Sequence, residues 1–292
     1  MSVIWGVPYL MIRVAVRELD PATLVFFRTS IGAVLLLPLA VKRREIAPLK
    51  AYWKPVVLYT VVEIGIPWLL LSTAETHISS SLSGLLIAAV PLVGTVLAFA
   101  TGTRGLFGPL QIVGLLIGLG GVAALAGLDV GSAQAGSLVA MAVVVVCYAT
   151  GPWILSRYLA DAPRLGVVVA SLVITAVAYA PAAAVEMPAH FPSAEVIAAV
   201  LGLGVVCTAL AFPIFFDLIG EVGPVRATVI TYVNPAVALL LGVTLLHELF
   251  TAGTALGFVL VLGGSFLATR SGTDAPAPAA EPEPELGRAG PT

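Results

Sequence analysis

Charged side chains are scarce in this sequence. Only 10% of the 292 residues are Asp, Glu, Lys or Arg, whereas a soluble domain carries about 25%. The hydrophobic share is 59% and the mean hydropathy is +1.07. This small number of charged side chains cannot cover a surface exposed to water. Most of the chain must therefore lie in lipid. The net charge of −2 offers no basic surface, and no nucleic-acid partner is expected.

Cysteine and catalytic motifs are also lacking. Cys147 and Cys207 lie in apolar runs without CxxC or Cys/His spacing, which favours a packing role over a disulfide or a metal site. The sequence has no HExxH, GxSxG or Walker A motif. We therefore expect no enzyme activity, no metal and no cofactor. The N-terminus has neither the basic region nor the cleavage site of a signal peptide.

Long apolar runs fill the rest of the chain. They predict ten membrane-spanning helices, because each run approaches or exceeds the length that crosses a bilayer. The segment 271–292 is rich in Pro, Ala and Glu, cannot bury apolar surface and is expected to form a disordered cytoplasmic tail. The predicted helices cover residues 2–17, 22–41, 55–74, 79–101, 108–127, 135–157, 165–185, 196–218, 223–246 and 252–269.

The two halves of the chain repeat each other with a constant offset. Five helices per half is an odd number, so the second half must enter the membrane from the opposite side, as in the inverted repeats of secondary transporters. The predicted fold is an all-α membrane protein with ten transmembrane helices in two inverted five-helix repeats, residues 1–128 and 129–270. The offset is 144 for each of the pairs Pro8 and Pro152, Arg13 and Arg157, Pro91 and Pro235, and Gly120 and Gly264.

The distribution of Lys and Arg predicts the orientation, because cytoplasmic loops carry an excess of both. With the N-terminus inside, the outer loops hold only Arg17. Both termini are therefore expected in the cytoplasm. The predicted inner segments hold eleven of the fourteen basic residues: Lys42, Arg43, Arg44, Lys50, Lys54, Arg104, Arg157, Arg164, Arg226, Arg270 and Arg288.

Three prolines are expected to break helices beside a solute cavity. Pro91 and Pro235 each fall about twelve residues into a predicted helix, near the middle of the membrane. Pro67 lies four residues after Glu63 and frees a backbone carbonyl there. Irregular backbone at this depth is tolerated where it is buried in protein or faces water. The alternative is a packing kink without a ligand.

Glu63 is the sharpest candidate for chemistry. It lies about eight residues into its helix, roughly 12 Å from the inner edge, where an ionised carboxylate is costly and needs a partner. Arg28 is the expected partner. Glu63 is predicted to bind substrate or a proton; a structural ion pair or a neutral, hydrogen-bonded Glu63 is the alternative. Arg28 either holds an anionic group with its planar fork or extends to the outer interface.

Further candidates are aromatic or polar side chains at depth. Asn234 can both donate and accept hydrogen bonds, so Asn234 and Tyr232 are predicted to bind the solute; an interhelical hydrogen bond is the alternative. Trp68 is predicted to line the cavity, or else to serve packing.

Two pairs of glycines are spaced for close helix approach. Gly114-x3-Gly118 and Gly253-x3-Gly257 allow two backbones to come together. We expect packing within the chain, with a homodimer face as the alternative.

The order of several short motifs resembles a known family, the EamA-type members of the drug/metabolite transporter superfamily. The resemblance covers about residues 3 to 270 and implies a ten-helix bundle of two inverted repeats around a central cavity. It also implies uniport, exchange or proton-coupled movement of small metabolites, often export. The matching motifs are Trp5-Gly6, Phe27-Arg28, Ala74-x3-Ile78-Ser79, Gly223-Pro224-x-Arg226-Ala227, Thr231-Tyr232-x-Asn234-Pro235 and Glu248.

Two departures from the family pattern stand out. The resemblance implies a Gly-Glu pair at the end of the fourth helix, but the matching stretch reads Gly102-Thr103-Arg104, so the acidic residue is missing from the first half. The apolar lead before Trp5-Gly6 is also shorter than the family's.

Together these features predict a transporter in a bacterial-type cytoplasmic membrane. It would move a small-molecule substrate by alternating access, with export as the expected direction and proton coupling as one option. The cavity is expected between the third, fourth, eighth and ninth helices. Two alternatives stay open: an anion exchanger for sugar phosphates or nucleotide sugars, and a membrane scaffold without transport.

Overall fold

The computed structural model describes residues 1–100, 108–127, 132–222 and 230–269. These residues form helices joined by short connections, and the described part contains no strand. The first half holds α1 (Ser2–Gly6), α2 (Pro8–Ala15), α3 (Pro21–Lys42), η1 (Ala47–Tyr52), α4 (Trp53–Tyr59), η2 (Thr60–Gly65), α5 (Ile66–Ala74), α6 (Ser80–Ile87), α7 (Val90–Ala100) and α8 (Pro109–Gly127). The second half holds α9 (Ser132–Tyr158), α10 (Arg164–Val185), α11 (Ala194–Leu201), η4 (Gly202–Leu210), α12 (Ala211–Val222), α14 (Ile230–Leu245) and α15 (Ala252–Thr269).

Seven helical stretches are long and apolar enough to cross a membrane. Three shorter apolar helices, Ser2–Ala15, Pro109–Ala124 and Val233–Leu245, occupy the first, fifth and ninth predicted positions. The largest difference from the predicted boundaries is in the third helix, which starts at Ala47 rather than at residue 55. The predicted tail 271–292 and the stretch Gly102-Thr103-Arg104 lie outside the described residues.

Local chemistry explains where several helices begin. Asp20 caps α3 by accepting a 3.0 Å hydrogen bond from the Ala22 amide, and Pro21 occupies the first turn, where its missing N–H is harmless. Ser79 Oγ accepts from the Leu82 amide at 3.2 Å and caps α6 in the same way. Because these caps satisfy amides that a helix start leaves free, each helix begins at a defined residue.

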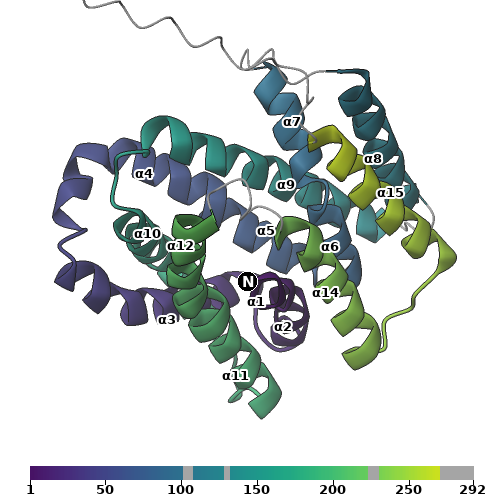
Figure 1. Cartoon of the computed structure of the whole chain (residues 1–292). Helices are drawn as coiled ribbons and strands as arrows, with labels where there is room; N and C mark the ends of the chain where they lie inside the picture. Colours follow the sequence, from purple (N-terminus) through teal and green to yellow (C-terminus); the bar gives the residue numbers. More distant parts are fainter. Residues whose placement is uncertain (101–107, 128–131, 223–229, 270–292) are drawn as a thin grey trace, which may run out of the picture.

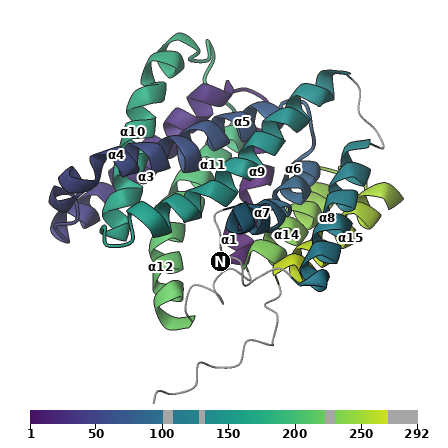
Figure 2. The ribbon, with the colours of Figure 1, turned by 90° about the horizontal axis from the view of Figure 1, so that it is seen from above.

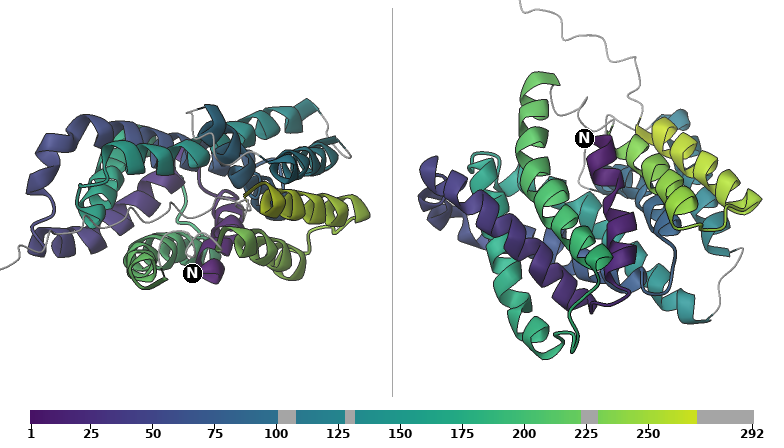
Figure 3. Two further views of the ribbon diagram at one scale, coloured as in Figure 1. Left: turned by 45° about the horizontal axis from the view of Figure 1, so that its top comes forward. Right: turned by 90° about the horizontal axis from the view of Figure 1, so that it is seen from below.

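Helices from opposite halves of the chain pack against each other. α8 and α15 lie side by side at one end of the bundle, whereas α3 and α10 lie together at the other end (Figures 1 and 2). α6 packs against α14 between them. α1 also packs against α14, and α9 packs against both α5 and α7. The two further views in Figure 3 show the same grouping.

Glycines allow the close contact between α8 and α15. A Cβ atom on Gly264 would lie 2.3 Å from the Gly118 amide nitrogen, and one on Gly114 would lie 2.5 Å from the Ala268 nitrogen. The backbones meet here without intervening side chains. The Gly114-x3-Gly118 spacing therefore serves packing within the chain, as its sequence suggested.

Two membrane helices contain a wide π-helical segment. The first is η2, between α4 and α5, and the second is η4, between α11 and α12. The repeat offset relates them, because 60 + 144 = 204 and 65 + 144 = 209, and both sums fall within Gly202–Leu210. Such segments frequently occur at functional sites, since they free backbone groups and re-aim side chains.

Candidate functional site

Arg28 is buried at the centre of contacts among three helices. Its side chain, on α3, is only 7% exposed. Its Nε donates a 3.2 Å hydrogen bond to Thr208 Oγ1 of η4. Its guanidinium carbon lies 3.5 Å from the ring centroid of Trp68 on α5, which is a cation–π stack. The sequence candidates Arg28 and Trp68 are therefore in direct contact, and we call Arg28, Trp68 and Thr208 the Arg28 cluster.

The wide turn of η4 positions Thr208 for this contact. Thr208 Oγ1 donates a 2.8 Å hydrogen bond to the Leu203 carbonyl five residues earlier. The same hydroxyl accepts from Arg28, so its one donor hydrogen and an acceptor lone pair are both used. Gly32 of α3 permits the approach, because a Cβ there would lie 2.7 Å from Thr208 Cγ2.

Glu63 lies in η2, with its carboxyl group against α9. Its Oε2 is buried and has no hydrogen-bond partner within the described ranges. The space for this oxygen exists because residue 151 is glycine: a Cβ on Gly151 would lie 1.8 Å from Glu63 Oε2. Since Arg28 is held by Thr208 and Trp68, the expected Glu63–Arg28 ion pair is not formed in this structure.

Tyr148 of α9 connects the two charged candidates. It lies within electrostatic reach of both Glu63 and Arg28 and beside Trp68. Glu63 and the Arg28 cluster thus belong to one buried polar region that spans α3, η2, α5, α9 and η4.

Helix α10 holds η2 in place. Tyr179 donates a 3.0 Å hydrogen bond from its hydroxyl to the Gly65 carbonyl. Thr60 at the start of η2 donates to the Val56 carbonyl at 2.7 Å and contacts Ser171 Oγ at 2.9 Å. These contacts supply partners for polar groups that a wide turn would otherwise leave without one.

The candidate prolines have different surroundings. Pro67 is buried at the start of α5, between Glu63 and Trp68. Pro91 lies at the start of α7, where the fourth membrane helix is interrupted, and the Ala88 carbonyl accepts a 2.9 Å hydrogen bond from Ser265. Pro235 is buried inside α14, which continues through it.

The remaining candidates come from the second half. Asn234 is half-buried on α14, and a Cβ on Gly6 of α1 would lie 2.9 Å from its backbone carbonyl. Tyr232 lies on the same helix, but its side chain is outside the described part of the chain. These two stay predictions for solute binding.

A second group of charged residues lies near the end of α5. Glu248, which follows α14, accepts four hydrogen bonds from the amides and hydroxyls of Ser80 and Ser81 at the start of α6; three are 2.8–2.9 Å long. The carboxylate therefore sits at a helix N-terminus, where negative charge is favoured. Nearby, Arg13 donates to the backbone carbonyl of Glu75, a residue with no exposed surface.

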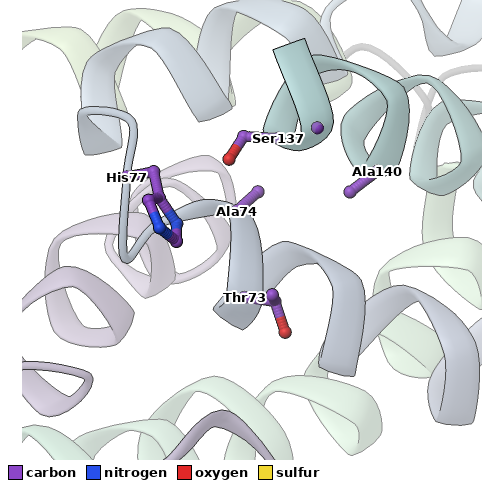
Figure 4. A pocket seen from close by; sticks show the side chains of 6 residues that line it. Thr73, Ala74, His77, Ser137 and Ala140 are labelled. Carbon is purple, nitrogen blue, oxygen red and sulfur yellow. The ribbon is translucent and has the colours of Figure 1, made fainter. Parts of the chain in front are cut away.

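A pocket of about 200 Å³ opens between α5 and α9. Figure 4 shows that its lining comes from the end of α5, the following loop and the start of α9. Of the third, fourth, eighth and ninth helices, between which the sequence predicted a cavity, only the third lines this pocket. The pocket is lined by Thr73, Ala74, His77, Gly136, Ser137 and Ala140.

Sequence reasoning missed several residues of the buried region. No sequence motif marks Thr208, Tyr148 or Gly151. Each becomes part of the site only because the fold places it beside Arg28, Trp68 or Glu63. The repeat offset was an available signal for Thr208. Because 208 − 144 = 64, its equivalent position in the first half is Ile64, the neighbour of Glu63 in the sequence. Glu75 carried a simpler signal, namely a carboxyl group at the end of an apolar run.

Comparisons with known proteins agree with this architecture. The EamA-like transporter family matches residues 1–127 and 135–270. An "Uncharacterized transporter YvbV" of Bacillus subtilis (strain 168) is 23% identical over 271 residues, covering 90% of this chain and 87% of the relative. A solved structure described as "Crystal structure of protein" is similar in fold, with a TM-score of 0.67, 23% identity and coverage of 92% of this chain and 94% of that chain.

The family match extends over both halves and most of the chain. With several apolar helices long enough to cross a bilayer, it identifies a multi-pass membrane transporter of the drug/metabolite type. The chain belongs to the EamA-like transporter family.

Proposed function

We propose that this protein is a secondary transporter that exports small metabolites or drugs across a bacterial-type cytoplasmic membrane. One observation carries the proposal: a buried carboxyl oxygen of Glu63 without a hydrogen-bond partner in the described chain, close to the Arg28 cluster. A buried group of this kind within a membrane helix is expensive and points to a solute or proton pathway.

Alternating access follows from an inverted arrangement of the two halves. The contacts of α3 with α10 and of α8 with α15 join helices at equivalent positions of the two repeats, and the contact of α6 with α14 joins the fourth membrane helices of the two halves. The wide segments η2 and η4 are also related by the repeat offset. A site between two such halves opens to one side when one half moves and to the other side when its counterpart moves.

Glu63 is the proposed proton or cation site. A carboxyl group without donors is stable as a neutral acid, and it ionises when water or a cationic group of the solute replaces the apolar surroundings. Exchange of a proton for a cationic solute at Glu63 would couple export to the proton gradient.

Trp68, Tyr232 and Asn234 are the proposed solute contacts. Trp68 offers an aromatic face that Arg28 holds in one orientation, and the two residues of α14 supply hydrogen-bonding groups. The alternative of an anion exchanger has less support. Arg28 is the one cation of this cluster among the described residues, and its Nε already donates a hydrogen bond to Thr208.

The test begins with a thermal-shift screen of the purified protein against amino acids, polyamines and cationic drugs. A stabilising compound is then used for transport in proteoliposomes at several pH values. Glu63→Gln should abolish the pH dependence and reduce the rate, whereas Glu221→Gln, a change at an exposed carboxyl group, should leave both unchanged. A Glu63→Gln protein with wild-type rate and pH dependence would remove Glu63 from the mechanism.

A further inference from the structure

Glu75 is a buried carboxyl group that the proposed transport cycle does not yet use. It directly follows α5 and has no exposed surface. Neither of its carboxyl oxygens has a hydrogen-bond partner in the described ranges. Ser83 Oγ on α6 is the polar group that lies next to this carboxyl group, although the two form no hydrogen bond of ordinary geometry in this structure. Two buried polar groups that face each other without a well-formed hydrogen bond mark an incompletely satisfied place in the fold.

The titratable groups around Glu75 come from three parts of the chain. Glu248 faces it from the chain after α14, and Arg13 and Tyr9 face it from α2. Arg28 on α3 also lies within electrostatic reach. Arg13 donates to the backbone carbonyl of Glu75 instead of its carboxyl group, so no cation neutralises the side chain directly.

Two neighbouring carboxyl groups therefore have opposite surroundings. Glu248 accepts four hydrogen bonds, the pattern of an ionised carboxylate. The carboxyl group of Glu75 has only the Ser83 hydroxyl beside it, and an ionised group there would also be repelled by Glu248. Neighbouring carboxyl groups whose surroundings differ in this way take different protonation states.

We propose that Glu75 is a second proton-binding site, located at the end of the bundle that the Lys and Arg distribution places outside. This inference rests on the proposed function, which places a first proton site at Glu63. With this end closed, Glu75 holds a proton and its O–H donates to Ser83 Oγ. When this end opens, water enters, the proton passes to the outer solution and Arg13 stabilises the resulting carboxylate.

The position of Glu75 connects it to Glu63. The two residues lie 75 − 63 = 12 positions apart on one helical run, about 18 Å at 1.5 Å per residue. Tyr9 lies within electrostatic reach of Glu75, Arg28 and Tyr148, and Tyr148 lies within reach of Glu63. Phenol groups thus occupy the interval between the two carboxyl groups.

Infrared spectroscopy of the purified full-length protein tests the proposal without a known substrate. Exposed carboxyl groups are ionised at pH 7, so carboxylic-acid C=O absorption at this pH reports buried acids. We expect Glu75→Gln to remove one such band and Glu63→Gln to remove another, whereas Glu221→Gln removes none. Glu75→Asp should restore a shifted band, and size-exclusion profiles should show that each variant is folded.

The two proposals fail in different ways. An unchanged acid absorption in folded Glu75→Gln would overturn the Glu75 site, while loss of the Glu63 band would leave the proposed function intact. If both bands are present but transport does not depend on pH, the proton coupling of the proposed function is wrong, even though Glu75 binds a proton.

Discussion

Arg28 shows how a single residue fixes the geometry of the buried region. It joins α3 to η4 through Thr208 and to α5 through Trp68. A buried charge that makes a hydrogen bond and a ring stack is costly to leave without these contacts. Its first role is therefore to hold α3, α5 and η4 in fixed positions relative to one another.

The variant Arg28→Ala removes both contacts and leaves a cavity. We expect it to lower stability by about 2–4 kcal/mol, the range for losing a charged hydrogen bond together with a desolvated cation–π contact. Thermal unfolding in detergent measures the effect. The control is Arg17→Ala, at an exposed position, which should change stability by less than about 0.5 kcal/mol. Equal melting temperatures for the two variants would contradict this role.

Gly151 shows that the site depends on an absent side chain. A methyl group at this position would overlap the Glu63 carboxyl group. Gly151→Ala should therefore displace that carboxyl group and lower the transport rate about tenfold or more, since small misplacements of a functional group are costly. The measurement is solute uptake in proteoliposomes with the compound found by thermal shift.

A matched glycine separates this effect from helix propensity. Gly120 has no atom within 4 Å of an added Cβ, so Gly120→Ala should keep the wild-type rate and gain up to about 1 kcal/mol in helix stability. The combination Gly151→Ala with Glu63→Asp, whose shorter side chain makes room, should recover part of the lost rate. Wild-type transport by Gly151→Ala alone would show that the contact is unimportant.

The residues could be predicted from the sequence only in part. Glu63, Arg28 and Trp68 were recognisable because charged and aromatic groups at membrane depth are unusual. Gly151 was not recognisable, because glycine is common in membrane helices, and Thr208 differed from other membrane threonines only through the repeat offset. The predicted Glu63–Arg28 ion pair was wrong for a different reason: the sequence contains no information on which side of α3 faces η4.

At the scale of elements, interruptions of regular helix distinguish this bundle. The prolines predicted a break near residue 91, and the fourth membrane helix is indeed interrupted before α7. The wide segments η2 and η4 were not predicted, since no residue type specifies an i to i+5 hydrogen bond. α14 continues through Pro235, which shows that proline alone does not decide whether a membrane helix breaks.

The α8–α15 contact gives a prediction at this scale, because two adjacent glycines have opposite surroundings. A Cβ on Gly264 would lie 2.3 Å from the Gly118 backbone, whereas one on Gly263 would have no neighbour within 4 Å. Gly264→Ala should therefore lower stability by about 1–3 kcal/mol through overpacking, and Gly263→Ala should be neutral or slightly stabilising. Thermal unfolding of both proteins decides this, and equal stability of the two would show that the backbones do not meet there.

At the scale of the whole molecule, repetition in the sequence was the most informative feature. The constant offset of 144 predicted two equivalent units. In the fold, α3 packs against its equivalent α10, α8 against its equivalent α15, and the fourth membrane helices of the two halves meet where α6 contacts α14. The offset carries no information on how the units tilt or where a cavity opens, because these depend on packing between distant segments. The cavity between the third, fourth, eighth and ninth helices stays a prediction.

The central claim is that one buried site becomes accessible from each side of the membrane in turn. Cys207 is a natural probe, because it lies in η4 within electrostatic reach of Arg28 and is 1% exposed. The variant Cys147→Ala leaves it as the single cysteine of the chain. A membrane-impermeant maleimide applied to right-side-out and to inverted vesicles reports its accessibility from each side.

The account predicts slow labelling of Cys207 in both kinds of vesicle, and protection in both by the compound that the thermal-shift screen identifies. Labelling from only one side, or from neither side of a folded protein, would contradict a site that opens alternately to the two faces of the membrane.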